Sequence, residues 1–292
     1  MERLKVFVGL LVFGALVPIS LNSWNALTRA EHRAERSGTY LALGDKLQDR
    51  GHHEDAVMAY QQALELGPFD EMIRKRLARA QCRVSAERPE SLNEAVARAL
   101  AIRLETLGLD AEDGPEVGVA LGQIDLMLGR GGQSHTQFEA IAKAHPKSAI
   151  AQFAVGKSRL IQGMKTAALA PLKKAVKLEP DTPRFRKILA AAFSSVEKWS
   201  RSEEEWARAI DMADDGPSRL KLGLVQIELR KFEKAVESLA KAKALVQNRK
   251  QRAEAAAALG YALHGLGRHA EAIDELRFSA RITGHVDTRL NL

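Results

Sequence analysis

The stretch Ser37–Asp70, SGTYLALGDKLQDRGHHEDAVMAYQQALELGPFD, contains the pattern that decides the fold. Its apolar residues recur at helical spacing on both sides of Gly51, which predicts two short amphipathic helices. Gly44 lies within the first helix and Tyr60 within the second, while Pro68 follows the point where the second helix must end. Gly suits the turn and Pro cannot continue a helix. The stretch therefore predicts a helical hairpin.

The same spacing recurs along the chain with a period of about 34 residues. Copies are predicted at 37–70, 71–108, 115–148, 149–182, 183–216, 216–249 and 253–286. The small residue of the first helix recurs as Gly122, Gly156, Gly223 and Gly260. A helix pair of this length cannot bury enough apolar surface alone, so each pair must stack on its neighbours. The pattern predicts an all-α chain of stacked hairpins.

This arrangement resembles the tetratricopeptide repeat (TPR) family, whose motif has a small residue at position 8, Ala at 20 and 27, a bulky residue at 24 and Pro at 32. The resemblance implies a right-handed α-solenoid of about seven hairpins over residues 37–286, with 287–292 as a tail. Bulk at position 8 would push the two helices apart. We therefore expect Gly156→Leu to cost about 1–3 kcal/mol of stability.

Residues 1–27 are predicted to form a single transmembrane helix. Val6–Leu21 contains no charged residue and follows Arg3 and Lys5. A helix of about 16 residues spans about 24 Å, which is somewhat short of the ~30 Å hydrocarbon core, but Arg3 and Lys5 can reach outward to the interface. A cleaved signal peptide, which has the same basic start and apolar middle, is the alternative. Residues 28–36 are predicted to be a polar helical connector to the first repeat.

The short basic leader is expected to stay on the inner side of the membrane, which for an inner-membrane protein of a bacterium would place the repeats in the periplasm. Arg29, Arg33 and Arg36 follow the span, so the charge rule discriminates weakly and a cytoplasmic orientation stays open. Secretion to the periplasm after signal cleavage is the third possibility.

The net charge of +7 permits acidic partners, but the 44 basic and 37 acidic residues are interspersed, so nucleic-acid binding is not expected. The TPR resemblance implies that a protein partner binds the first helix of each pair, at positions 2, 5, 9 and 12. The residues at these positions include Lys75, Arg79, Phe153, Lys157, Leu160, Arg184, Lys187, Leu220, Leu224, Ile227, Tyr261 and His264. This groove would be basic in its middle and apolar toward its carboxyl end. It predicts a peptide or helix partner with acidic and apolar side chains.

Signals for chemistry are weak. Gly156-Lys157-Ser158 lacks the strand and loop that a phosphate-binding loop requires. His53 occupies a position where other copies have aromatic residues, so packing explains it better than metal ligation. Cys82 is the only cysteine and has no recognisable catalytic partner. No enzymatic activity, cofactor or metal is expected.

The sequence therefore predicts a membrane-tethered scaffold or adaptor that binds proteins and assists assembly of a cell-envelope complex. Bacterial envelope TPR proteins are similar in layout. One alternative is a structural subunit of a larger membrane complex, bound through its lateral faces. Another is a receptor of the mitochondrial outer-membrane type, with its repeats in the cytosol.

Overall fold

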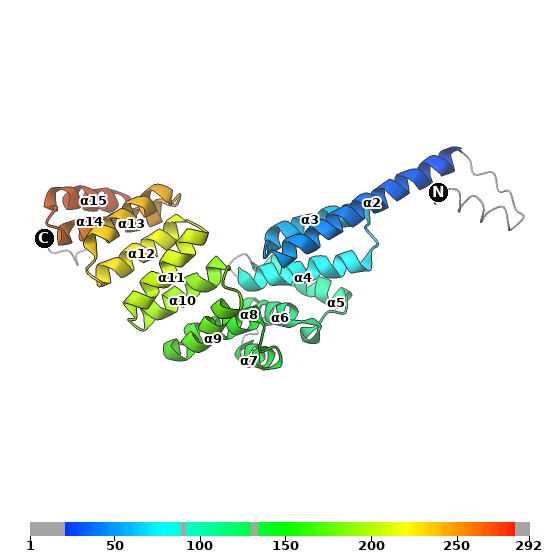
Figure 1. The fold of residues 1–292 in the computed structure, drawn as a ribbon, viewed down its shortest axis with the longest axis horizontal. Coiled ribbons are helices and arrows are strands. Elements are labelled where there is room, and N and C mark those ends of the chain that lie inside the picture. The colour runs from blue at the N-terminus through cyan, green and yellow to red at the C-terminus, as the bar shows by residue number, and fades with distance from the viewer. Residues whose placement is uncertain (1–20, 89–91, 130–133, 284–292) are drawn as a thin grey trace, which may run out of the picture. The chain divides into compact units, whose positions relative to one another are not determined.

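The computed structural model describes residues 21–88, 92–129 and 134–283, and every regular element in these ranges is a helix (Figure 1). The helices are α2 (Leu21–Asp49), α3 (His53–Leu66), α4 (Glu71–Glu87), α5 (Glu94–Thr106), the 3₁₀ turn η2 (Ala111–Asp113), α6 (Pro115–Met127), α7 (Ser134–Ala144), α8 (Ala149–Ile161), α9 (Lys165–Leu178), α10 (Pro183–Ser195), α11 (Trp199–Met212), α12 (Gly216–Glu228), α13 (Phe232–Leu245), α14 (Arg249–Gly265) and α15 (His269–Thr283). The predicted all-α architecture is confirmed over these residues.

Most of the predicted membrane anchor, residues 1–20, and the predicted tail, 287–292, lie outside the described residues. Among the helices that are described, none combines the length and the apolar character needed to cross a membrane. The predicted connector 28–36 is part of α2, which runs without a break from Leu21 to Asp49.

The chain divides into two compact units, Met1–Gln81 and Cys82–Leu292. In the first unit, α2 packs against α3, and the side chain of Tyr60 fills the space beside Gly44. The Tyr60 hydroxyl donates a hydrogen bond of 2.7 Å to Asp45 Oδ1, and Arg76 of α4 forms an ion pair with the same carboxylate. Leu77 joins Tyr60 in the apolar core. A buried tyrosine thus has both its ring and its hydroxyl satisfied.

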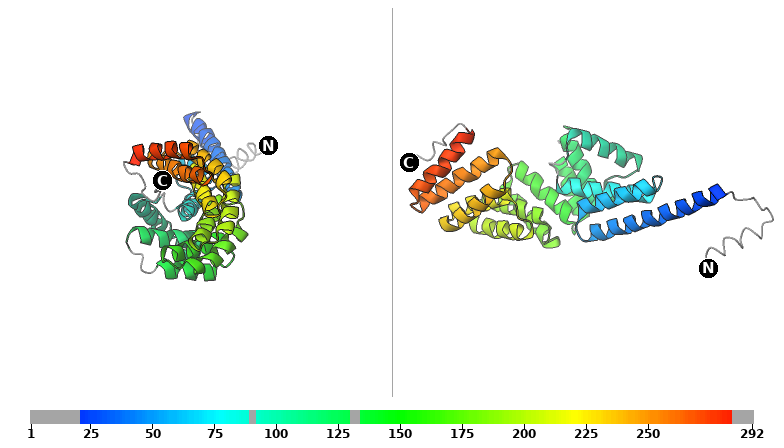
Figure 2. Two further views of the ribbon diagram at one scale, coloured as in Figure 1. Left: turned by 90° about the vertical axis from the view of Figure 1, so that its left-hand side faces the viewer. Right: turned by 90° about the horizontal axis from the view of Figure 1, so that it is seen from above.

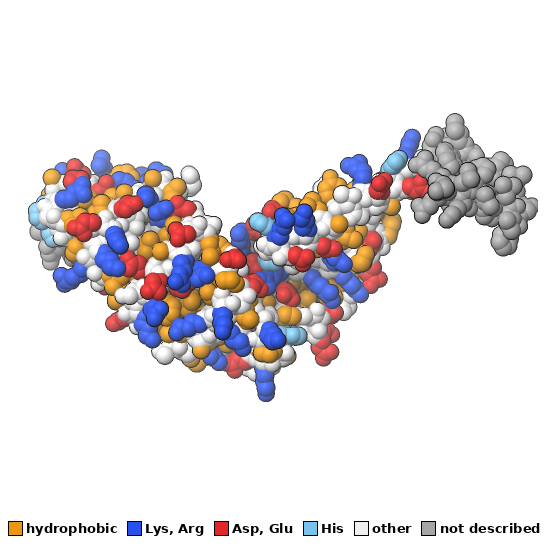
Figure 3. All heavy atoms as spheres, viewed as in Figure 1, with side chains coloured by type: hydrophobic (Ala, Val, Ile, Leu, Met, Phe, Trp, Pro, Cys, Tyr) orange, Lys and Arg blue, Asp and Glu red, His pale blue; other side chains and the backbone are white. Residues whose placement is uncertain are grey.

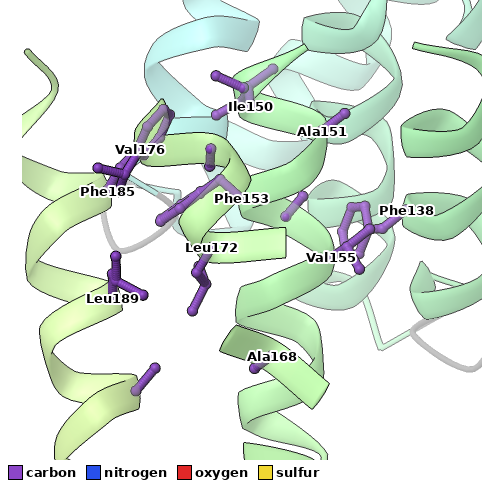
Figure 4. Close-up of a cluster of buried hydrophobic side chains, with 14 of the residues drawn as sticks. Phe138, Ile150, Ala151, Phe153, Val155, Ala168, Leu172, Val176, Phe185 and Leu189 are labelled. Atoms are coloured by element: carbon purple, nitrogen blue, oxygen red, sulfur yellow. The ribbon is translucent and has the colours of Figure 1, made fainter. Parts of the chain in front are cut away.

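In the second unit the hairpins α6–α7, α8–α9, α10–α11, α12–α13 and α14–α15 follow one another in order (Figures 1 and 2). The second helix of each hairpin packs against the first helix of the next, as in α9 against α10 and α13 against α14. The largest core lies where α8, α9 and α10 meet, with the rings of Phe153 and Phe185 stacked at 4.6 Å between centroids (Figure 4). The stacking of hairpins therefore creates apolar clusters between neighbouring hairpins that no single hairpin has.

The small residue at position 8 lies where the two helices of a hairpin cross, as the sequence predicts. A Cβ placed on Gly156 would lie 2.5 Å from Leu172 Cγ, and one on Gly223 would lie 2.4 Å from Leu239 Cγ. In the other hairpins Gly44, Gly122 and Gly260 face Tyr60, Phe138 and Leu276 in the same way, at 2.5, 2.6 and 2.9 Å. The bulky residue at position 24 thus fills the space that the glycine leaves.

The turn between the two helices of a hairpin requires a left-handed residue at position 15. Gly51, Gly163 and Gly267, which the sequence assigns to this turn, have φ of +77°, +77° and +74°. Glu197 and Arg230 occupy the same position in two other hairpins with φ of 58° and 56°. The turn geometry is therefore kept even where the residue is not glycine, at a cost in backbone strain.

Candidate functional site

The first helices of the hairpins in the second unit form the inner side of the stack. Helix α6 contacts α8, α8 contacts α10, and α12 contacts α14. Among the described residues, the second helices α7 and α9 do not contact each other to a comparable extent. The side on which successive helices approach each other more closely is the concave one. The inner side is therefore the surface on which the sequence places its candidate groove.

The structure places the predicted groove residues in different environments. Lys75 and Arg79 belong to the first unit, and the remaining groove residues belong to the second. Side chains that are exposed or half-buried are Lys75, Arg79, Lys157, Leu160, Arg184, Lys187, Leu224, Ile227, Tyr261 and His264. Phe153 and Leu220 are buried.

The assignment of Phe153 and Leu220 to a binding surface is therefore wrong. Phe153 is 0% exposed because it stacks on Phe185 and lies in the core shared by α8, α9 and α10 (Figure 4). Leu220 is 3% exposed and packs with Leu239 in the core of α12, α13 and α14. Both side chains hold adjacent hairpins together and are closed to a partner.

The end of α4 contributes a buried arginine to the second unit. Only 6% of the Arg83 side chain is exposed, and its Nε donates a hydrogen bond of 2.6 Å to Glu87 Oε1. The same guanidinium hydrogen-bonds Glu179, which follows α9, and lies 3.7 Å from Glu116 on α6. Burial acts to lower the pKa of Arg83, but the surrounding carboxylates raise it overall. One guanidinium thus connects three segments of the chain.

The backbone and core contacts of α4 place its end across the inner side of the second unit. Ala86 is 0% exposed and belongs to the same apolar cluster as Phe153. Its carbonyl oxygen accepts a hydrogen bond of 3.1 Å from Gln123 Nε2 of α6. The inner side of α6 and α8 is therefore covered by the chain itself, which explains why the predicted groove is closed at Phe153.

The basic residues predicted for the middle of the groove have acidic neighbours. Lys187 forms an ion pair with Asp215, whose Oδ1 also accepts the backbone N–H of Ser218 at 2.7 Å and so caps α12. Burial acts to raise the pKa of Asp215, but Lys187 and Ser218 outweigh it and lower that pKa. Arg184 acts electrostatically on the carboxyl of Glu87. These cations serve the fold, and across the face shown in Figure 3 both charge signs are interspersed.

Beyond α10 the inner side presents apolar side chains that the core does not cover. Leu224 and Ile227 of α12 are half-buried against the cluster around Leu239, and Tyr261 of α14 is 44% exposed. His264 lies one turn after Tyr261. We call Leu224, Ile227, Tyr261 and His264 the apolar strip; α12 and α14, which carry it, are in contact. These four predicted groove residues keep accessible surface on two helices that are in contact.

Sequence reasoning missed the arginine cluster and a histidine pair. Arg83 and Glu87 are four residues apart on a helix, which is a recognisable signal for an ion pair. Glu179 is 96 positions from Arg83, and no local pattern connects them. His264 Nδ1 lies 3.1 Å from His269 Nδ1 across a turn of left-handed geometry. The turn brings these two side chains together, and no pattern in the sequence indicates the contact.

These contacts define a repeat protein whose stacked hairpins expose one inner side. A family model for the tetratricopeptide repeat matches residues 119–183 and 220–278. These two stretches of the second unit therefore match the tetratricopeptide repeat family. No curated protein matches the chain in sequence.

Several solved structures resemble the fold. The crystal structure of MamA is 22% identical with a TM-score of 0.52, over 56% of this chain and 95% of MamA. A chain of the Cut9–Hcn1 hetero-tetramer of the APC/C is 18% identical with a TM-score of 0.56, over 86% of this chain and 48% of that chain. YrrB, described as a TPR protein with an unusual peptide-binding site, is 15% identical with a TM-score of 0.51, over 59% of this chain and 90% of YrrB. The TM-scores show a shared fold, and at sequence identities this low the likeness extends to the fold alone.

Proposed function

We propose that the chain is a non-enzymatic scaffold that binds a polypeptide segment on the apolar strip of α12 and α14. The observation that carries this proposal is the exposure of Tyr261 on α14, together with the partial exposure of Leu224 and Ile227 on α12, which is in contact with α14. Apolar side chains on a concave surface lose contact with water when a partner helix or strand covers them. Tyrosine is enriched among the residues that dominate binding energy at such interfaces.

The occupant of the strip is an apolar face of a partner segment. Lys221 and Glu254 border the strip at 3.8 Å from each other and offset each other's charge, so they add no preference for one charge sign. The partner segment is therefore selected by shape and apolar contact at this surface. Such helix-in-groove binding uses anchor residues spaced by one helical turn.

We propose further that residues 1–27 tether this scaffold to the inner membrane of a bacterium, with the repeats in the periplasm. The charge-free segment Val6–Leu21 behind Arg3 and Lys5 supports the tether. Tethering raises the effective concentration of the scaffold toward partners in the same membrane, which suits assembly of a cell-envelope complex. Protease accessibility of the repeats in intact and permeabilised spheroplasts tests the orientation. Release of the protein by alkaline extraction would contradict an integral anchor.

A photoreactive amino acid at position 261 tests the binding surface. The expected result is one discrete crosslinked adduct from native membranes, lost when Ile227 is replaced by Ser. The matched control carries the same photoreactive residue at position 161, because Ile161 is an apolar side chain with 74% exposure that lies outside the strip. The same adduct from both positions would contradict selective binding at the strip. A stoichiometric complex that survives Ile227→Ser would favour a structural subunit bound through other faces.

A further inference from the structure

A cavity opens on the opposite side of the second unit, between the second helices α7 and α9. It has a volume of about 460 Å³ and is floored by α8. Glu139 and Lys143 of α7, Arg159 of α8, and Pro171 and Lys174 of α9 line it. Its size falls within the range of pockets that hold small ligands or side chains. It is separate from the apolar strip, which lies on α12 and α14.

The cavity lies beside a proline inside α9. Pro171 has no N–H to donate to the carbonyl oxygen of Ala167, four residues earlier, and an internal proline costs a helix about 3 kcal/mol. Arg159 Nη1 donates a hydrogen bond of 3.1 Å to this oxygen and replaces the missing donor. The equivalent position of α11 and α13 is Glu205 and Ser238, so the repeat itself does not require proline here.

The cavity has an excess of positive charge. Arg159 Nη2 donates a hydrogen bond of 2.7 Å to Glu139 Oε1, so the one carboxylate among the described lining residues is already neutralised. Lys143 and Lys174 are exposed, and neither has an ion pair or hydrogen bond to any residue that the structure describes. Two uncompensated ammonium groups therefore face one concave site.

We propose that this cavity binds an acidic side chain of a partner polypeptide, with Lys143 and Lys174 as its contacts and Arg159 as the residue that holds the site open. Charge complementarity selects a carboxylate. Among the described residues, the lining contains no aromatic ring on which a nucleobase could stack, which favours an acidic peptide over a single-stranded nucleic acid. The site is distinct from the apolar strip and does not depend on it.

The test measures binding of a fluorescein-labelled peptide of alternating Glu and Ser, which carries no apolar side chain for the apolar strip, to the full chain by fluorescence anisotropy. The double variant Lys143→Glu/Lys174→Glu is expected to bind about tenfold more weakly, because both contacts become repulsive. The matched control is Lys234→Glu/Lys250→Glu, which makes the same charge change at two exposed lysines of α13 and α14. The control is expected to bind like the unaltered chain.

An uncharged peptide and two further variants test whether the carboxylates and the cavity are both required. The same peptide with Gln in place of Glu is expected to bind at least tenfold more weakly. Pro171→Ala restores an N–H that can donate to the carbonyl oxygen of Ala167, so it is expected to raise the melting temperature. It is also expected to weaken peptide binding, because Arg159, which holds the site open, is then no longer required as the donor to that oxygen. Tyr261→Ser, which alters the apolar strip, is expected to leave binding of this probe unchanged.

Four results would overturn the proposal. These are no binding by the unaltered chain, equal binding of the Gln peptide, equal losses in the two double variants, and tighter binding of a labelled DNA oligonucleotide that the first double variant abolishes. Circular dichroism checks that each variant is folded. Lys143→Gln/Lys174→Gln repeats the test without introduced acidic groups.

Discussion

Replacing Gly156 and Leu172 with Ala, singly and together, tests the packing on which the repeat fold depends. A Cβ on Gly156 would lie 2.5 Å from Cγ and 2.7 Å from Cδ2 of Leu172, and 3.3 Å from the carbonyl oxygen of Ala168. Leu172 and Ala168 are both 0% exposed. The added methyl must therefore displace a buried side chain that has no free space around it.

The magnitude follows from two opposing terms. Overpacking a core costs about 1–3 kcal/mol, and contacts as short as these belong to the upper part of that range, about 2–3 kcal/mol. Against this, Ala is better than Gly inside a helix by about 1 kcal/mol. We expect Gly156→Ala to lower stability by about 1–2 kcal/mol, and the bulkier Gly156→Leu to reach about 3 kcal/mol. Leu172→Ala alone should cost about 2–5 kcal/mol. In the double variant the new methyl enters vacated space, so the loss should fall below the sum by about 1–2 kcal/mol.

Hydrogen exchange of the α8 and α9 amides in the full chain measures these losses locally, which suits a repeat protein whose hairpins need not unfold together. Gly38→Ala is the control, because Gly38 lies in α2 and a Cβ there would have no neighbour within 4 Å. In this control the α2 amides should gain up to about 1 kcal/mol of protection, and the α8 and α9 amides should be unchanged. Unchanged stability of Gly156→Ala, or strictly additive losses in the double variant, would refute the close helix crossing.

Three further outcomes follow from the described contacts. Arg83→Met should destabilise the second unit by about 3–5 kcal/mol, because it removes the hydrogen-bonded cation of the buried Glu87. Burial already raises the pKa of Glu87, so this loss should shrink as the pH falls and the carboxyl protonates, which urea unfolding at acidic and neutral pH would measure. Arg230→Gly and Glu197→Gly should each raise stability by up to about 1 kcal/mol, since both residues are left-handed; thermal melts showing a loss would contradict a strained turn. Burial, aided by the bond to a carboxylate, raises the pKa of Tyr60. The stability that Tyr60 contributes should therefore be complete below a pH of about 10 and should decline above it as the hydroxyl ionises. Urea titrations at alkaline pH would measure this decline, which should be smaller in Tyr60→Phe.

The sequence predicted the features that depend on the period of the repeat. Glycine at position 8, the bulky residue at 24 and the turn at 15 are local properties, so Gly156 and Leu172 could be paired without coordinates. The period also locates the turn in repeats where the residue at position 15 is not glycine. Arg230 has the left-handed backbone that its position requires, although its side chain gives no such signal.

The features that the sequence missed depend on contacts between distant segments. The motif places Phe153 on the inner side, and it is buried because Phe185 and the core around Ala86 cover it. Lys187 reads as a groove cation, but it is paired with Asp215 at the start of the next hairpin. A motif position states which side of a helix a residue occupies. Whether another segment covers that side depends on the tertiary structure.

The two proposed surfaces follow from this distinction. The end of α4 closes the inner side at α6 and α8, which leaves α12 and α14 for a partner that follows the inner side. The cavity of Lys143 and Lys174 opens between second helices, where successive helices make fewer contacts. One surface is apolar and the other is positive, so they select different partner segments. If one partner carried both segments, the second contact would form at the effective concentration set by the first, and losing either surface would weaken binding more than its own contacts explain.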